Sequence, residues 1–253
     1  AMSTVAYLAV APEGRTSAAC IWLHDDALPG LRRLTDAIHD EGAAAAAQMG
    51  HAGPVADPRS NGAPSLAPSS SFSPVTMRRI RAVGDADLVR IREAYVRGAT
   101  RAVDAGFDAL ELHLGHNYLL SAFLSPRLNK RTDAYGGDLD GRSRYPREVV
   151  RAVRDAVGDR VAVTAKLNMR DGVKGGFEIE ESLEVAAGLE ADGALDGLEL
   201  TGGSSLANPM YLFRGDAPMD EMAATMSGVM KLGFRLAGPK MMPTYPFEEA
   251  FFL

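Results

Sequence analysis

Short apolar runs alternate along the chain with longer amphipathic stretches. The apolar runs cover residues 4–10, 43–49, 107–112, 161–167 and 195–200, and each has the length of a buried strand. The amphipathic stretches cover residues 28–41, 85–105, 146–157 and 179–190 and are predicted to be helices. This order of elements predicts an α/β fold in which helices pack outside a parallel sheet.

Three parts of the chain fit this pattern less well. The run 43–49 contains five alanines, which are poor strand formers, so its assignment depends on the alternating order of the elements. Residues 53–80 are rich in Pro, Ser and Gly, which predicts a long irregular loop. Residues 204–253 show no strand pattern, and their Met-rich and Pro-rich pieces predict a loop excursion or a lid.

The composition is that of a globular protein with a buried core. Of 253 residues 46% are hydrophobic, and the net charge of -6 offers no basic surface for nucleic acid. The single cysteine, Cys20, excludes an internal disulfide and a thiolate metal cluster. No apolar run has membrane-spanning length and the first residues lack the basic segment of a signal peptide, so we expect a cytoplasmic protein without a membrane partner.

The most informative segment is residues 106–118. An apolar run ends there in a loop that carries His113, His116 and Tyr118. In barrels of alternating strands and helices, the loops at the carboxyl ends of the strands carry the chemistry. Two imidazoles can donate hydrogen bonds to one substrate oxygen, and a nearby phenol can give up a proton. The segment therefore predicts an active site suited to the reduction of a polarised double bond of a small molecule.

The next residues make the segment resemble the old yellow enzyme family of flavin-dependent ene-reductases. Tyr118 is followed by two leucines, by Phe-Leu-Ser-Pro at 123–126, by Asn-x-Arg-Thr-Asp-x-Tyr-Gly-Gly at 129–137 and by Arg142. These ordered matches over roughly thirty positions are more specific than an isolated short motif. The resemblance implies a TIM (β/α)8 barrel with bound FMN, reduced by NADPH or NADH. It also implies that His113 and His116 bind the substrate oxygen and that Tyr118 protonates the α-carbon.

The same resemblance implies a set of cofactor-binding residues. Gln48 matches the glutamine that hydrogen-bonds the flavin ring in the family, whereas His51 in the same motif has a structural role. Lys166 falls where the family usually has an arginine near the flavin N1 and O2 atoms, and a cation there would stabilise the charge that reduction produces. Gly202 and Gly203 end the last strand, where paired glycines allow close approach of a ligand or form a tight turn.

About five strands are evident, whereas a closed barrel of this kind has eight. Aligned by its motifs, residues 4–10 resemble the second barrel strand and residues 195–200 the sixth. We therefore expect residues 1–253 to form a single FMN-binding barrel domain that lacks the first strand and the last two. In the family the missing strands contribute to the flavin pocket and hold the flavin phosphate.

Other interpretations remain open. The histidine pair could bind a metal, but no Asp, Glu or Cys lies nearby with convincing ligand spacing, so no metal is expected. A lysine at the end of a barrel strand, such as Lys166, is also where a Schiff-base lyase keeps its nucleophile. An inactive barrel fragment is the third reading. The sequence leaves the physiological acceptor and a homo-oligomeric state open.

Overall fold

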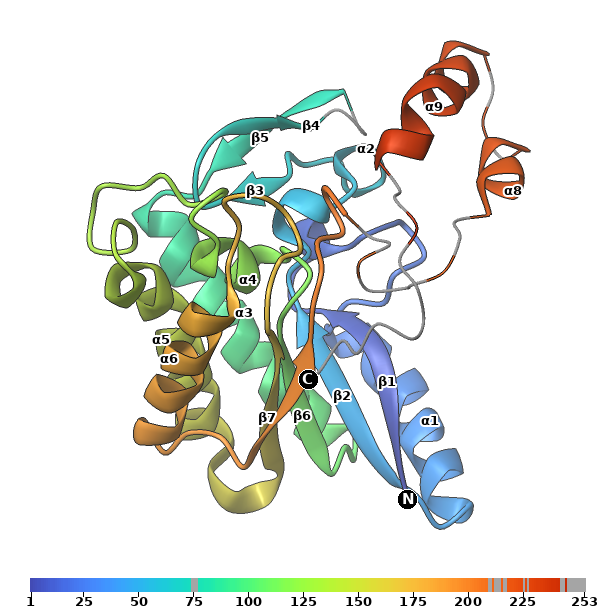
Figure 1. The fold of residues 1–253 in the computed structure, drawn as a ribbon. Helices are drawn as coiled ribbons and strands as arrows, with labels where there is room; N and C mark the ends of the chain where they lie inside the picture. Colours follow the sequence, from blue (N-terminus) through green and yellow to red (C-terminus); the bar gives the residue numbers. More distant parts are fainter. Residues whose placement is uncertain are drawn as a thin grey trace.

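The computed structural model describes residues 1–73, 77–208, 211, 215, 218–224, 226, 228–241 and 244, and its centre is a five-stranded parallel sheet (Figure 1). The strands are β1 (Met2–Ala9), β2 (Ala44–Gly50), β6 (Ala109–Leu114), β7 (Ala162–Asn168) and β8 (Gly197–Thr201). They lie side by side in the order β1-β2-β6-β7-β8, and every neighbouring pair is parallel. The predicted α/β fold with five strands is confirmed.

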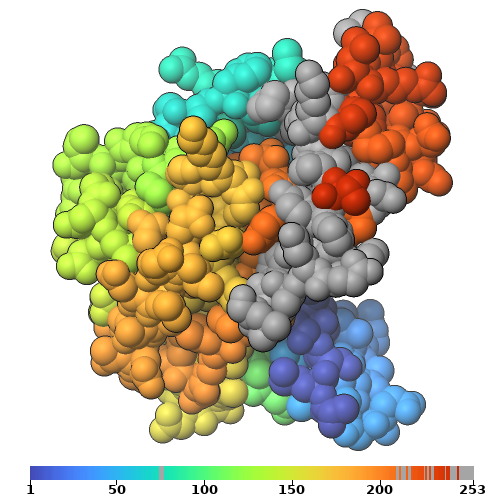
Figure 2. Space-filling view, in the orientation of Figure 1, coloured from blue at the N-terminus to red at the C-terminus, as the bar shows by residue number. Residues whose placement is uncertain are grey.

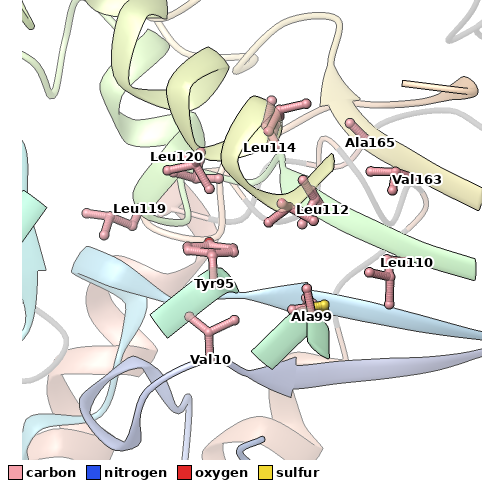
Figure 3. Close-up of a cluster of buried hydrophobic side chains, with 14 of the residues drawn as sticks. Val10, Tyr95, Ala99, Leu110, Leu112, Leu114, Leu119, Leu120, Val163 and Ala165 are labelled. Carbon is pink, nitrogen blue, oxygen red and sulfur yellow. The ribbon is translucent and has the colours of Figure 1, made fainter. Parts of the chain in front are cut away.

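Four long helices connect these strands. They are α1 (Leu28–Asp40), α3 (Asp85–Asp104), α5 (Leu139–Val157) and α6 (Ile179–Ala191). Alternate residues of the strands point towards them and are fully buried, among them Met49 on β2, Leu112 on β6 and Ala165 on β7. Figure 3 shows Leu110, Leu112 and Leu114 of β6 in this core with Tyr95 and Ala99 of α3.

Packing explains the high alanine content of strand β2. Its outward residues Ala45 and Ala47 are completely buried beneath the helices. Helix α3 approaches so closely at Gly98 that an added Cβ would lie 3.1 Å from Cε of Met49. Small side chains on β2 therefore let α3 approach the sheet, and the order of elements identified this strand where its propensity did not.

Most predicted boundaries differ from the observed ones by one or two residues, and two of the differences change an interpretation. The strand expected at residues 107–112 runs from Ala109 to Leu114, so His113 belongs to β6 and does not follow it. The helix expected from Pro146 begins at Leu139, because the Asp138 carboxylate caps it by accepting a hydrogen bond from the Gly141 N–H group at 3.0 Å.

The prediction of a long irregular loop at residues 53–80 was wrong in part. Strands β3 (Leu66–Ala67), β4 (Ser71–Ser73) and β5 (Arg78–Ala82) form a small sheet with β5 in the centre, and residues 74–76 lie outside the described part. Figure 1 shows these strands beyond the carboxyl ends of the large sheet. Most residues of β4 and β5 are exposed, so these strands lack the apolar pattern by which a strand is recognised.

The remaining elements are short or lie near the end of the chain. They are the helices α2 (Pro58–Asn61), α4 (Leu119–Leu124), α8 (Met219–Ala224) and α9 (Gly228–Met241) and the 3₁₀ turns η1 (Pro12–Gly14), η2 (Asp25–Ala27), η3 (Gly53–Val55) and η4 (Gly158–Arg160). Figure 2 shows α8 and α9 projecting from the body of the molecule. The loop or lid predicted at residues 204–253 thus contains two helices, and much of it lies outside the described residues. No described helix is long and apolar enough to cross a membrane.

Two glycines with a left-handed backbone provide a test of this packing. Gly53 has a φ of 58°, and a Cβ there would lie 2.8 Å from the backbone of Leu119, whereas Gly62 has a φ of 65° and nothing within 4 Å. We expect Gly62→Ala to lower the free energy of unfolding by about 1 kcal/mol, the cost of the left-handed conformation. Gly53→Ala should lower it by about 2–4 kcal/mol, because α4 must also move. Equal losses in urea unfolding would contradict this account.

Candidate active site

The inner face of the large sheet carries a row of polar side chains. Because successive side chains of a strand point to opposite faces, the residues between the buried apolar ones face away from the helices. They include Gln48 on β2, Glu111 and His113 on β6, Lys166 on β7 and Glu199 on β8. The strand register places His113 beside Lys166, and Lys166 beside Glu199. The sheet thus brings two predicted catalytic or cofactor-binding side chains onto adjacent positions.

A tight turn after β6 positions the second histidine. His116 and Asn117 both have a φ of 58°, and the backbone N–H group of His116 donates a hydrogen bond to Oδ1 of Asn168 at 3.0 Å. Asn168 is completely buried at the end of β7. A Cβ at Gly115 would lie 2.9 Å from Cγ2 of Thr201, so the turn fits against β8 only with glycine at this position.

The structure joins the two imidazoles to each other. Nδ1 of His116 lies 3.2 Å from Nε2 of His113, and Nε2 of His116 lies 2.8 Å from Oγ1 of Thr201. Only one hydrogen atom fits between the two ring nitrogens, so one ring donates to the other. The two rings and Thr201 form a hydrogen-bonded chain. Nδ1 of His113 is buried and has no partner among the described residues. In either direction of this chain one ring gives its only N–H hydrogen to the other ring, so both can donate to a shared substrate oxygen, as predicted, only if the bond between the rings breaks.

Both imidazoles are neutral at physiological pH. Burial lowers the pKa of His113 well below 6.5, and the positive charges of His116 and Lys166 add to this effect. Burial, followed by the charge of Lys166, lowers the pKa of His116 to about 4. Each ring therefore has one N–H donor and one bare nitrogen at pH 7.

Tyr118 packs against the ring of His113. Its ring makes edge-to-face contacts with the rings of His113 and Tyr7, with centroids 4.5 Å and 5.3 Å apart. Burial raises the pKa of the Tyr118 hydroxyl to about 12, so it keeps its proton at neutral pH. The buried His51 supports the same loop, since its Nδ1 accepts the N–H group of Gly53 and its carbonyl oxygen accepts that of Leu119.

The residues predicted to hold a flavin ring share one carboxylate. Nε2 of Gln48 donates to Oε1 of Glu111 at 2.6 Å, and Nζ of Lys166 lies 3.3 Å from the same oxygen. Nζ of Lys166 also lies 2.6 Å from Oε1 of Glu199. Although burial favours the neutral amine, the two carboxylates raise the pKa of Lys166, so it is a cation. An amide and a cation on one face fit the mixed donors and acceptors of an isoalloxazine edge.

The paired glycines at the end of β8 form part of a turn. The N–H group of Gly203 donates to the carbonyl oxygen of Arg170 at 2.9 Å, and the carbonyl oxygen of Gly203 accepts Nδ2 of Asn168 at 2.9 Å. Both backbone groups of Gly203 are therefore engaged within the protein. Gly202 and Gly203 lie beside the histidine turn, and the contacts of Gly203 favour the tight-turn interpretation over contact with a ligand.

Sequence reasoning missed four residues of this site. Glu111 and Glu199 share a face with His113 and Lys166, so the period of two within the predicted strands could have identified them. Thr201 reaches the site from β8 and Tyr7 of β1 packs beside Tyr118, and these contacts depend on turns that no local pattern specifies. Among the described residues no group of three or more His, Cys, Asp or Glu side chains could hold a metal ion.

Comparisons with known proteins identify the family and the fold. Residues 1–198 match the sequence profile of the NADH:flavin oxidoreductase / NADH oxidase family. The chain is 55% identical over all 253 residues to the 4,4'-dithiodibutanoate disulfide reductase of Rhodococcus erythropolis and covers 63% of it. It is 35% identical over 209 residues to the NADPH dehydrogenase of Halalkalibacterium halodurans, with 82% of this chain and 60% of that protein covered.

The fold has counterparts among solved structures. The structure of the old yellow enzyme homologue of Zymomonas mobilis matches 97% of this chain and 74% of its own, with a TM-score of 0.74 and 20% identity. That likeness concerns the fold alone. The chain spans less than two thirds of the length of the two curated relatives above.

The low pKa of His116 predicts a pH dependence of stability. Between pH 6.5 and about 4 the unfolded chain binds a proton at His116 that the folded protein does not bind. The free energy of unfolding should therefore decrease as the pH falls through this window. His116→Asn removes the titrating ring, so its unfolding free energy should decrease less over the same window. Since carboxylates titrate in both proteins, the difference between the two curves is the measurement, and identical curves would contradict the assignment.

Proposed function

Because the chain belongs to the NADH:flavin oxidoreductase / NADH oxidase family, we propose that it takes part in FMN-dependent hydride transfer from NADPH or NADH to a small-molecule acceptor. The membership confirms the resemblance to the old yellow enzymes, and the family uses FMN with a nicotinamide reductant. The observation that carries the proposal is the register of β6 and β7, which sets His113 beside Lys166. The residue proposed to bind the substrate and a residue proposed to bind the cofactor thus lie next to each other.

Two residues are proposed to hold the cofactor ring. FMN, when bound, takes a hydride from the nicotinamide and passes a hydride to the acceptor. Lys166 is a cation on the inner face, so it stabilises negative charge that develops near it. The amide nitrogen of Gln48 is engaged with Glu111, so its amide oxygen is directed away from that carboxylate.

An activated alkene is the acceptor that the histidine and tyrosine arrangement supports best. Once the bond between the two rings is broken, the neutral imidazoles of His113 and His116 can each donate one hydrogen bond to a carbonyl or nitro oxygen. Tyr118 keeps its proton until the α-carbon of the substrate takes it. His113 is buried and His116 and Tyr118 are partly buried, and the low local dielectric strengthens these hydrogen bonds.

A small organic disulfide is the second candidate acceptor. A relative 55% identical over the whole chain is described as a disulfide reductase. A hydride delivered to one sulfur breaks the S–S bond and yields one thiol and one thiolate. Tyr118 is placed to give its proton to the leaving thiolate. Turnover of an enone and of 4,4'-dithiodibutanoate by the same preparation would separate the two candidates.

The Schiff-base alternative is disfavoured by the surroundings of Lys166. A lysine nucleophile must lose its proton, and burial or a neighbouring cation usually lowers its pKa. Here Glu111 and Glu199 raise the pKa of Lys166 and hold it as an ion pair. The same contacts suit a fixed cation better than a nucleophile.

The first test of the proposal is flavin binding. We expect the protein to bind FMN without a covalent link, to be yellow, and to release the chromophore on denaturation. Lys166→Met should weaken FMN binding at least about tenfold, equivalent to about 1.4 kcal/mol, because it removes the cation from the inner face. Lys174→Met, at an exposed position, is the matched control and should leave the affinity unchanged. Colourless protein after expression with excess flavin would contradict the proposal and favour an inactive fragment.

The second test separates the two half-reactions. Tyr118→Phe removes only the hydroxyl, so FMN reduction by NADPH or NADH should proceed at a near-normal rate. Turnover of an enone should fall about a hundredfold or more, as for loss of a general acid. Tyr7→Phe is the control, since the Tyr7 hydroxyl donates to the carbonyl oxygen of Gly14 and lies next to the same ring. Equal slowing of both half-reactions in Tyr118→Phe would show that this tyrosine only packs.

A further inference from the structure

A buried carboxylate lies between the two residues proposed to hold the cofactor. The side chain of Glu111 is 6% exposed, and its Oε1 atom takes both the amide nitrogen of Gln48 and a contact with Nζ of Lys166. The proposed hydride transfer assigns no step to Glu111. Because this buried carboxylate contacts both residues, its protonation state affects the hydrogen-bonding groups and the charge that they offer to the cofactor.

Glu111 also shares its proton with a second carboxylate. Burial, followed by a hydrogen bond with Glu199, raises the pKa of Glu111 to about 7, while Gln48 and the charge of Lys166 act in the opposite direction. The hydrogen bond with Glu111 lowers the pKa of Glu199. A hydrogen bond between two carboxyl groups needs a proton on one of them, and the more buried Glu111 is the one that carries it.

The groups that face Glu111 come from three other strands. Lys166 faces it from β7 and Glu199 from β8, while β2 contributes the uncharged Gln48. His113 follows two residues later on the same strand and is neutral. With both carboxylates ionised, Glu111, Glu199 and Lys166 together have a net charge of -1. One bound proton makes the group neutral.

The proton on Glu111 determines the orientation of the Gln48 amide. An ionised carboxylate can only accept, so Gln48 turns its NH2 group towards it and leaves its oxygen free. A protonated Glu111 uses its hydrogen towards Glu199 and accepts more weakly from the Gln48 NH2 group, which is then free to turn outward. Protonation also removes one of the two negative charges beside Lys166 and leaves its positive charge less compensated.

We infer that Glu111 is a positioning residue that orients Gln48 and takes up one proton when negative charge is delivered to the cofactor edge. This inference rests on the proposed function. A hydride brings two electrons and one proton to the cofactor, and the second proton comes from solvent and forms an O–H bond on the Glu111 carboxylate. Two electrons and two protons are then taken up together, and no other bond is formed or broken by Glu111.

Infrared difference spectroscopy tests this step directly. The reduced-minus-oxidised spectrum of the FMN-loaded protein at pH 8 should contain the C=O stretching band of a newly protonated carboxylic acid. Glu111→Gln should lack the band, and Glu111→Asp should keep it at a shifted frequency. Glu148→Gln on α5, a control in which a carboxylate paired with Arg92 is lost, should keep the band unchanged. A band that survives in Glu111→Gln, or no band in the native protein, would overturn the inference.

The reduction potential provides a second, independent measurement. Above pH 7 Glu111 is ionised in the oxidised protein and can bind a proton on reduction, whereas below pH 7 it is already protonated. One extra proton per two electrons is a tenfold change in the equilibrium constant per pH unit, or about 30 mV. The native potential should depend on pH more steeply than that of Glu111→Gln by this amount above pH 7. If the potentials of the native protein and of Glu111→Gln change equally with pH, the role of Glu111 is overturned and the proposed function is not. If the native protein fails to bind FMN, both are overturned.

Discussion

The alternation of side chains across five hydrogen-bonded parallel strands is the constraint on which the rest of this structure depends. One set of positions packs against the helices and is almost wholly aliphatic, as Met49, Leu112 and Ala165 illustrate. The positions of the other set lie on the opposite face of the sheet and carry the polar and charged side chains of the site. A shift of one strand by a single residue would exchange the two sets, so the core and the site are fixed together.

The inner face keeps its charges by pairing them. An isolated buried carboxylate would cost several kcal/mol, and the contacts of Glu111 with Gln48 and Lys166 offset that cost. The uncharged histidine pair follows a different solution, in which burial removes the charge and hydrogen bonds engage three of the four ring nitrogens. Two neighbouring parts of one sheet thus provide a charged region and a neutral region, which suit a cofactor edge and a substrate oxygen respectively.

The sequence predicted four of the five strands and the histidine loop because their signals are local, whereas β2 was identified from the order of the elements. Apolar runs mark buried strands wherever both faces are covered, and the motif after His113 is specific over many positions. The small sheet at residues 66–82 was missed because its strands are exposed and short. The bond between His116 and Thr201 was also beyond prediction, since it joins residues on different strands through a left-handed turn. Glu111 could have been found by counting alternate positions from His113.

The hydrogen bonds along the row Thr201, His116 and His113 can run in either of two directions. If the Thr201 hydroxyl donates to His116, the next hydrogen points to His113 and leaves that ring with a hydrogen on its far nitrogen. If the row runs the other way, the same nitrogen is bare and accepts. The buried end of the row is therefore either a donor or an acceptor, and the hydroxyl at the other end selects which. Ligands that differ only in offering an oxygen lone pair or an O–H group would be told apart by the rotation of one threonine.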